Sequence, residues 1–251
     1  MTNGSAVDGR WTIIFDGDGT LWRCSEYYQA ADLACATIIH TALPGLDMPD
    51  DQLIRYGRFV QAALFERRGF YFDLFQDAWE EAYAHLAARL KQPIDPIVGA
   101  SIQGAFEVVR SAPYPLFEGV AETLAKLKTD GHQLHLLTLG DREFQLLKVR
   151  RNGIEALFDS IHPVQEPKGP QLRLLGLGGF AGRAMMVGDS LDSDVRPALR
   201  LGIVGVWLRN AGLPWLRTKR FPRGARFHTI ERVAELPRLI DQLNSAERPH
   251  H

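Results

Sequence analysis

Two carboxylates separated by a single glycine follow a short apolar run near the start of the chain. The run is Ile13 to Phe15, and Gly17 separates Asp16 from Asp18. Carboxylates this close repel one another when both are ionised, unless a cation or a shared proton intervenes. Asp and Gly are also common turn residues, so the motif alone is compatible with an ordinary tight turn. The rest of the chain must decide whether this pair does chemistry.

Further groups that can bind an anion or a cation occur later in the chain. They are Thr138 at the end of an apolar run, Lys168 in a loop, and Gly188-Asp189 followed by Asp194. Each has an ordinary explanation as a strand-ending threonine, a solvated lysine or a helix cap. Their joint occurrence, in this order, favours a common site.

The elements that must position these residues alternate between strands and helices. Apolar runs predict strands at residues 13–15, 133–138, 160–164, 184–187 and 203–208, with helical segments between most of them. This alternation is typical of a parallel sheet between two helical layers. Ligands of such sheets bind at the carboxyl ends of the strands, which is where these polar residues fall. The sequence therefore predicts an α/β fold with a three-layer, Rossmann-like core.

Residues 24–112 contain no convincing strand. Helices are predicted over 25–43, 50–67, 73–91 and 95–110. In the second of these, the residues expected on the buried side are Leu53, Tyr56, Phe59, Val60 and Leu64. This helical stretch indicates an all-helical cap domain over residues 23–113, inserted into a core made of residues 1–22 and 114–251.

Composition excludes several classes of protein. The chain has 251 residues, of which 45% are hydrophobic, enough to bury a sizeable core. A formal net charge of −1 gives no general attraction to nucleic acid or to an anionic membrane. No apolar run is long enough to span a bilayer, and the N-terminus lacks a signal-peptide core. We expect a cytoplasmic monomer or homodimer that binds neither nucleic acid nor membrane, with Cys24 and Cys35 as buried free thiols.

Taken together, these motifs resemble those of the haloacid dehalogenase superfamily of hydrolases over nearly the whole chain. The family pattern is a first strand ending in D-x-D-x-T, a second ending in Thr or Ser, a loop lysine, and a strand ending in G-D before a further Asp. The matching residues are Asp16-Gly17-Asp18-Gly19-Thr20, Thr138, Lys168, and Gly188-Asp189 with Asp194. The helical insert is similar to the first type of cap domain in that family.

The resemblance implies phosphoryl transfer through an aspartyl-phosphate. Asp16 would be the nucleophile, and Asp18 would protonate the leaving oxygen and then deprotonate the attacking water. Lys168 would offset charge on Asp16 and on the phosphate. The residues expected at the phosphate are Gly17, Thr138, Leu139 and Gly140.

The excess of carboxylates over lysine predicts a Mg²⁺ ion. The resemblance implies that Asp16, Asp189 and the backbone carbonyl of Asp18 hold it, with Asp194 supporting them from behind. Asp192 is the competing candidate for that supporting role, and Asp194 is favoured.

Asp18 distinguishes branches of the family. The carbon–halogen hydrolases lack this second Asp, because a halide leaving group needs no proton, so its presence favours a phosphatase acting on a small phosphorylated metabolite. Phosphonate-cleaving members use a cap lysine, and the predicted cap contains only Lys91. A haloacid dehalogenase, a phosphomutase and a non-catalytic phosphometabolite sensor remain as alternatives.

Candidates for reading the leaving group are Trp22, Arg23, Arg67 and Arg68. An arginine there suggests an anionic or polar leaving group, although a solvated loop explains each arginine equally well.

Two other sequence motifs are discounted. Residues 176–181 match a relaxed dinucleotide fingerprint in the wrong order of elements and are predicted as a turn. The basic segment 209–226 is predicted as a solvated loop and not as an RNA contact.

Overall fold

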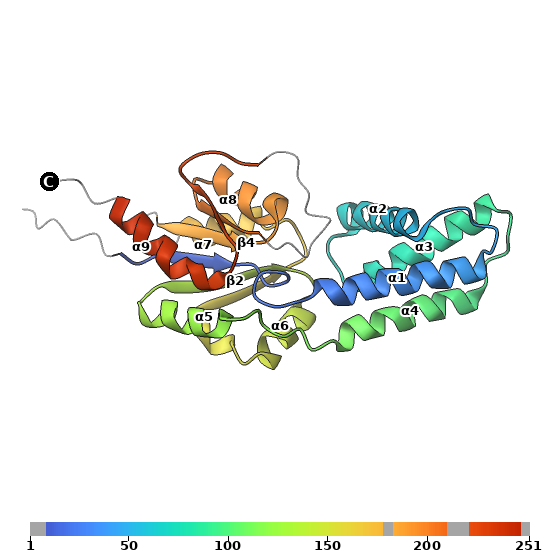
Figure 1. Cartoon of the computed structure of the whole chain (residues 1–251), viewed down its shortest axis with the longest axis horizontal. Coiled ribbons are helices and arrows are strands. Elements are labelled where there is room, and N and C mark those ends of the chain that lie inside the picture. Colours follow the sequence, from blue (N-terminus) through green and yellow to red (C-terminus); the bar gives the residue numbers. More distant parts are fainter. Residues whose placement is uncertain (1–8, 178–182, 210–220, 247–251) are drawn as a thin grey trace, which may run out of the picture. The chain divides into compact units, whose positions relative to one another are not determined.

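The computed structural model describes residues 9–177, 183–209 and 221–246, and these contain a parallel sheet of six strands (Figure 1). At its centre, β1 (Thr12–Phe15) pairs with β2 (Gln133–Leu139) and β4 (Ala184–Gly188). Beyond β2 lies β3 (Ser160–Val164), and beyond β4 lie β5 (Val204–Leu208) and β6 (Phe227–Ile230). The prediction of an α/β, Rossmann-like fold is confirmed.

Helices cover both faces of this sheet. On one face α7 (Gly169–Leu177) packs against β1, β2 and β4 and against α8 (Arg196–Arg200). α5 (Val120–Thr129) packs against β2 and against α9 (Leu236–Ala246), and α6 (Arg142–Arg151) connects β2 to β3. Short 3-10 turns, η1 (Glu155–Leu157) and η5 (Val233–Glu235), complete the connections. Because β1 and β4 are buried along their whole length, their apolar runs are continuous and do not alternate.

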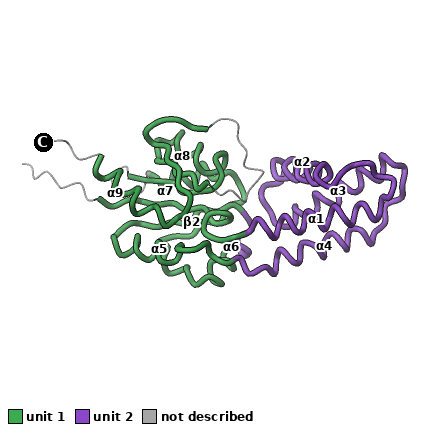
Figure 2. The backbone as a smooth tube through the Cα atoms, viewed as in Figure 1, with its two compact units in different colours: residues 1–23, 115–139, 146–251 green, residues 24–114, 140–145 purple. Residues whose placement is uncertain are grey.

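The chain divides into two compact units (Figure 2). The sheet unit comprises residues 1–23, 115–139 and 146–251, and the helical unit comprises residues 24–114 and 140–145. The helical unit contains α1 (Ser25–Ala42), α2 (Asp50–Arg68), α3 (Asp73–Arg89) and α4 (Pro96–Ser111). Within it α1 packs against α2 and α4, and α3 packs against the same two helices. The sequence gives no indication that residues 140–145 group with these helices.

A buried carboxylate ties three helices of this unit together. Asp32 of α1 accepts hydrogen bonds from Nε and Nη2 of Arg58 in α2, at 2.9 and 2.7 Å, and from Nε1 of Trp79 in α3, at 3.1 Å. Burial raises the pKa of Asp32, and the Arg58 guanidinium opposes that rise. A charge this deeply buried requires such partners, so the three residues fix how α1, α2 and α3 pack.

Two local predictions need correction. Phe59 is 70% exposed and does not belong to the buried side of α2, whereas Leu53, Val60 and Leu64 do. The helical segment between the strands predicted at 184–187 and 203–208 begins with a π-helical turn, η3 (Leu191–Val195), and α8 proper begins at Arg196. Cys24 and Cys35 are buried free thiols.

No helix in the described part of the chain is long and apolar enough to cross a membrane. Residues 178–182 and 210–220, which include parts of the predicted turn and of the basic segment, lie outside the described residues.

Candidate active site

The register of the three central strands brings the polar motifs to one edge of the sheet. Phe15 lies opposite Leu136 of β2 and Val187 of β4. The residues that follow these positions therefore come together, and the Asp16 N–H donates to the Val187 carbonyl at 2.9 Å. Asp16 comes directly after β1 and Asp189 directly after β4, at the carboxyl ends where α/β sheets bind ligands.

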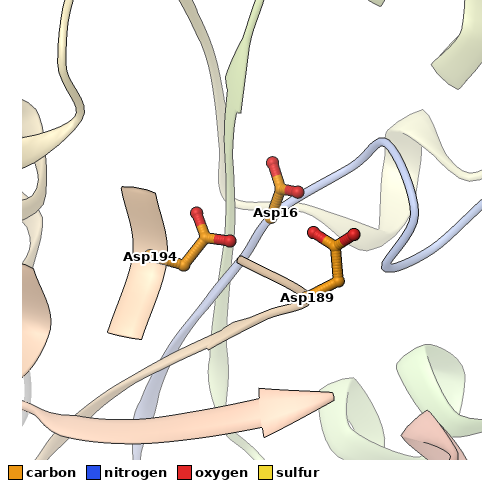
Figure 3. A group of neighbouring side chains, drawn as sticks. All are labelled: Asp16, Asp189 and Asp194. Atoms are coloured by element: carbon orange, nitrogen blue, oxygen red, sulfur yellow. The ribbon is translucent and has the colours of Figure 1, made fainter. Parts of the chain in front are cut away.

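Three carboxylates converge at this edge (Figure 3). One oxygen from each of Asp16, Asp189 and Asp194 lies within 4.8 Å of the others, and all three side chains are buried. Thr20 supports the group from the turn after β1: its hydroxyl donates to Asp16 at 3.4 Å and accepts the N–H of Asp189 at 3.0 Å. Oxygen atoms gathered in this way are the ligand set that hard divalent cations prefer.

Lys168 bridges two of these carboxylates from the loop before α7. Its Nζ donates to Oδ1 of Asp16 at 2.5 Å and to Oδ1 of Asp194 at 2.7 Å, and its side chain is 1% exposed. Burial alone would lower the pKa of this lysine, but the two carboxylates raise it above its ordinary value. Lys168 is therefore a fixed positive charge inside the cluster.

Crowding of buried carboxylates raises their pKa values. Burial is the main cause for Asp16, and the charge of Asp194 adds to it; although Lys168 opposes both, the pKa of Asp16 rises to about 7. The pKa of Asp189 is also raised, by burial first and then by the charges of Asp16 and Asp194. In the described part of the chain no hydrogen bond or ion pair reaches the Asp189 carboxylate. Without a further cation, this cluster holds excess negative charge.

The position of Asp194 depends on the π-helical turn. Both Asp194 and Val195 donate their N–H groups to the Ser190 carbonyl, at 3.1 and 3.2 Å, and Oδ2 of Asp194 accepts the Ser190 N–H at 3.0 Å. A Cβ atom on Gly188 would collide with the Asp194 carboxyl group. Asp192 instead points to solvent and pairs with Arg196. The structure therefore brings Asp194, and not Asp192, into the cluster.

Asp18 is held by partners that the sequence analysis missed. Nζ of Lys148, in α6, donates to both Asp18 carboxylate oxygens at 2.7 and 2.9 Å. Nε1 of Trp22 donates to Oδ1 of the same carboxylate at 2.5 Å. Trp22 is fully buried, and its contact with Asp18 was not predicted; its role as a reader of the leaving group stays a prediction. No sequence signal separates Lys148 from the other basic residues of α6.

The predicted phosphate contacts lie around the end of β2. The hydroxyl oxygen of Thr138 is buried and has no hydrogen-bond partner within the described residues. A Cβ on Gly17 would collide with the Trp22 ring and would lie 3.0 Å from this oxygen, so only glycine leaves room there. Leu139 is the last residue of β2, and Gly140 follows it with φ of 141°, a conformation that favours glycine. A buried, unpaired hydroxyl at a carboxylate cluster is suited to binding an anion that arrives with a cation.

The remaining candidates, Arg67, Arg68 and Arg23, have partners within their own units. Arg67 and Arg68 end α2 in the helical unit, and both face acidic residues of α3. Nη1 of Arg68 lies 3.1 Å from Oδ2 of Asp77, and Nη2 of Arg67 lies 3.9 Å from Oε1 of Glu81. In the sheet unit, Arg23 lines a cavity of about 730 Å³ and lies over the Phe117 ring.

Four aspartates and two lysines form the site, so its charge is −2 when all six groups are ionised. Lys148 neutralises Asp18, and Lys168 neutralises one of the three clustered carboxylates. The remaining excess equals the charge of one divalent cation. The donor set and the charge both fit a magnesium ion.

Known proteins resemble this chain in sequence. The model of the haloacid dehalogenase-like hydrolase family matches residues 12–202, which is most of the chain. Human N-acylneuraminate-9-phosphatase is 29% identical over 139 residues, covering 51% of this chain and 53% of the enzyme. Glyceraldehyde 3-phosphate phosphatase of Methanopyrus kandleri is 26% identical over 205 residues, covering 78% of this chain and 83% of the enzyme. The chain spans about half the length of the first curated relatives that it matches.

Solved structures show the same fold. A haloacid dehalogenase-like family hydrolase from Xanthomonas campestris superposes with a TM-score of 0.75 at 23% identity, covering 98% of this chain and 97% of that one. The L-2-haloacid dehalogenase of Xanthobacter autotrophicus superposes with a TM-score of 0.56 at 18% identity, covering 92% of this chain and 98% of that one. At these identities the likeness concerns the fold and not the reaction.

Proposed function

This chain belongs to the haloacid dehalogenase-like hydrolase family, and we propose that within it the protein is a Mg²⁺-dependent phosphomonoester hydrolase. The observation that carries the proposal is the buried cluster of Asp16, Asp189 and Asp194, whose negative charge Lys168 offsets only in part. Two relatives are named phosphatases, which supports the same reaction class.

The residues that would hold the metal are Asp16, Asp189 and the backbone carbonyl of Asp18, with Asp194 behind them. When bound, Mg²⁺ would supply positive charge that lets a phosphate dianion approach these carboxylates and that offsets the charge developing in the transition state. Lys168 would hold Asp16 in position and share the charge of the incoming phosphate.

Thr138 is proposed to bind the phosphate. Its buried hydroxyl has no partner among the described residues, so in the free protein the cost of removing it from water is not offset. A phosphate oxygen would accept that hydrogen bond, and Gly17, Leu139 and Gly140 would contact the same group. The resulting site would be selective for a tetrahedral anion.

The reaction would proceed in two displacements. Asp16 attacks phosphorus while Asp18 gives its proton to the leaving oxygen, so an aspartyl-phosphate and an alcohol are formed. Asp18 then takes a proton from water, which attacks the same phosphorus and releases phosphate and free Asp16. The presence of Asp18 favours an ester leaving group over a halide, because only the ester oxygen needs a proton.

The proposed substrates are small phosphorylated metabolites. The helical unit would serve as a cap that encloses the leaving group and excludes bulk water. Arg67 and Arg68 are proposed to read a polar or anionic leaving group, and both already face carboxylates in their own unit.

A panel experiment tests the proposal. Phosphate release is measured from a sugar phosphate, a nucleoside monophosphate and phosphoglycolate, in Mg²⁺ and in EDTA, with a 2-haloacid tested in parallel. We expect Mg²⁺-dependent phosphate release that is absent from the Asp16→Asn variant. Halide release without phosphate release would identify a dehalogenase. Isomerised ester would identify a mutase, and binding without turnover would identify a sensor.

A further inference from the structure

A fully buried lysine outside the family motifs holds the proposed acid/base. Lys148 lies 130 positions from Asp18 in the chain, and its side chain is 1% exposed. Its Nζ donates hydrogen bonds to Oδ1 of Asp18 at 2.7 Å and to Oδ2 at 2.9 Å, so one ammonium group binds both oxygens. An ammonium group buried to this degree is tolerated only with such a partner.

Trp22 is a second side-chain donor to the Asp18 carboxylate. Its indole N–H donates to Oδ1 of Asp18 at 2.5 Å, so this oxygen accepts from both Trp22 and Lys148. The turn that carries Asp18 is itself fixed, because the Gly17 carbonyl accepts the N–H groups of Thr20 and Leu21 at 3.1 and 2.8 Å. Backbone and side chain of Asp18 are thus both restrained, although the side chain remains 25% exposed.

Stability alone does not explain this lysine. A buried ion pair seldom stabilises a fold more than apolar side chains of the same volume would. Proton transfer, in contrast, requires the acid to lie within hydrogen-bond distance of a defined oxygen. A carboxylate at a partly exposed site turns freely about two bonds unless donors restrain it, and here two donors from different elements do so.

We propose that Lys148 is a positioning residue that, with Trp22, aims the Asp18 carboxyl group at the leaving oxygen. The inference rests on the proposed phosphatase function. Lys148 exchanges no proton: Asp18 gives one to the leaving oxygen and regains one from water. Oδ1 accepts hydrogen bonds from Lys148 and Trp22, and Oδ2 accepts one from Lys148, so the plane of the carboxyl group is fixed.

The test is how strongly the loss of activity depends on the leaving group of the ester. If Lys148 only stabilised the fold, its replacement would lower the activity on all esters alike. The variants are Lys148→Met, which keeps the length without the charge, Lys148→Arg, and Lys126→Met as a control on an exposed lysine of α5. Each is assayed with an alkyl phosphate, whose leaving oxygen needs a proton, and with p-nitrophenyl phosphate, whose leaving oxygen hardly does. The constant to compare is kcat/KM, which reports steps only through the departure of the leaving group.

For Lys148→Met we expect kcat/KM on the alkyl phosphate to fall by about 10²–10³, within the range of lost acid–base catalysis, and on the aryl phosphate by less than about tenfold. On the aryl phosphate kcat and KM should fall together, because hydrolysis of the aspartyl-phosphate still needs Asp18. In an Asp18→Asn background the same change should add less than about threefold. Lys148→Arg should recover part of the alkyl activity, and Lys126→Met should match wild type.

The inference would be overturned if Lys148→Met lowered kcat/KM equally on both esters. It would also be overturned if Lys148→Met lowered kcat/KM by the same factor in the Asp18→Asn background as in wild type. Either result would leave the phosphatase proposal intact. If Lys148→Met does not fold, the same comparison is made with Lys148→Arg against wild type. A crystal structure of the variant gives a readout independent of activity: we expect Asp18 to leave its position while Asp16 and Lys168 keep theirs. An unmoved Asp18 would contradict the proposal even if wild type hydrolysed neither ester.

Discussion

Nζ of Lys168 lies 2.5 Å from Oδ1 of Asp16, although 152 positions separate the two residues in the chain. The pair is buried, so its charges interact through protein and not through water. This contact and the matching one to Asp194 join the loop before α7 to the end of β1 and to the π-helical turn after β4. The electrostatic balance of the site depends on them.

Replacing Lys168 by Met should therefore remove activity and stability together. We expect kcat/KM to fall by about 10³, because a preorganised charge at the reacting group is lost. The free energy of unfolding should fall by about 3–5 kcal/mol, because Asp16 and Asp194 are left without their cation. Phosphate release and chemical denaturation measure the two effects. Lys126→Met is the control, and a Lys168→Met protein with wild-type turnover would refute the role given to this lysine.

Replacing Thr138 by Val should lower the activity but raise the stability. In Thr138→Val the buried, unpaired hydroxyl disappears, so the free energy of unfolding should rise by about 1 kcal/mol. The value of kcat/KM should fall about 10- to 100-fold, which corresponds to the loss of one hydrogen bond to a charged group. Thermal unfolding and steady-state kinetics test both parts. A less stable variant with unchanged kinetics would mean that the hydroxyl supports the fold and does not bind phosphate.

Gly188 should tolerate no side chain. In Gly188→Ala the new methyl group meets the Asp194 carboxyl group, so the cluster must shift, at a cost of about 1–3 kcal/mol and with loss of turnover. Gly104→Ala in α4 is the matched control, since nothing lies within 4 Å of a Cβ there and alanine favours a helix. Circular dichroism and phosphate release should separate the two variants. Equal behaviour would show that the site accommodates the methyl group.

The raised pKa values predict how stability depends on pH in the absence of metal. Burial raises the pKa of Asp16 to about 7, above its ordinary value of 3.8, and raises that of Asp189 as well. A group whose pKa is higher in the folded than in the unfolded state contributes stability that is complete below the unfolded pKa. That contribution is lost as the pH rises through the folded pKa. The cluster should therefore weaken the metal-free protein between about pH 4 and pH 7.

Thermal unfolding in EDTA measures this effect against a variant. Asp189→Asn should be more stable than wild type at pH 8 and should approach it at pH 5. Added Mg²⁺ should raise the unfolding temperature of wild type more at pH 8 than at pH 5, because protons compete with the metal. A Mg²⁺ effect that is the same at both values would argue against metal binding by these carboxylates.

The sequence was sufficient to predict the sheet, because its central strands are uninterrupted apolar runs. Ile13 to Phe15 and Ala184 to Val187 are buried on both faces, and each ends in a glycine or an aspartate that breaks the run. Parallel strands place their carboxyl ends at one edge, so the meeting of Asp16 and Asp189 followed from the fold class. Helix ends were predicted to within a few residues, as at α2 and α4.

Other parts of the site left no periodic signal. Lys148 stands in a helix with Arg142, Arg150 and Arg151, and only tertiary structure shows that it reaches Asp18. The π-helical turn at Asp194 depends on shared hydrogen bonds to Ser190 that no residue pattern announces. Phe59 fits a buried helical spacing, yet 70% of its surface is exposed, which the spacing alone does not reveal. The roles of Arg67 and Arg68 stay a prediction.

The most direct test of the central claim is to look for the phosphoryl group on Asp16 itself. Wild-type protein is mixed with excess alkyl phosphate and Mg²⁺, quenched in acid within milliseconds, and analysed by intact mass and peptide mapping. We expect a phosphoryl adduct on the peptide that carries Asp16, formed no more slowly than phosphate appears and absent from Asp16→Asn. Steady phosphate release with no adduct, or an adduct on another residue, would contradict it.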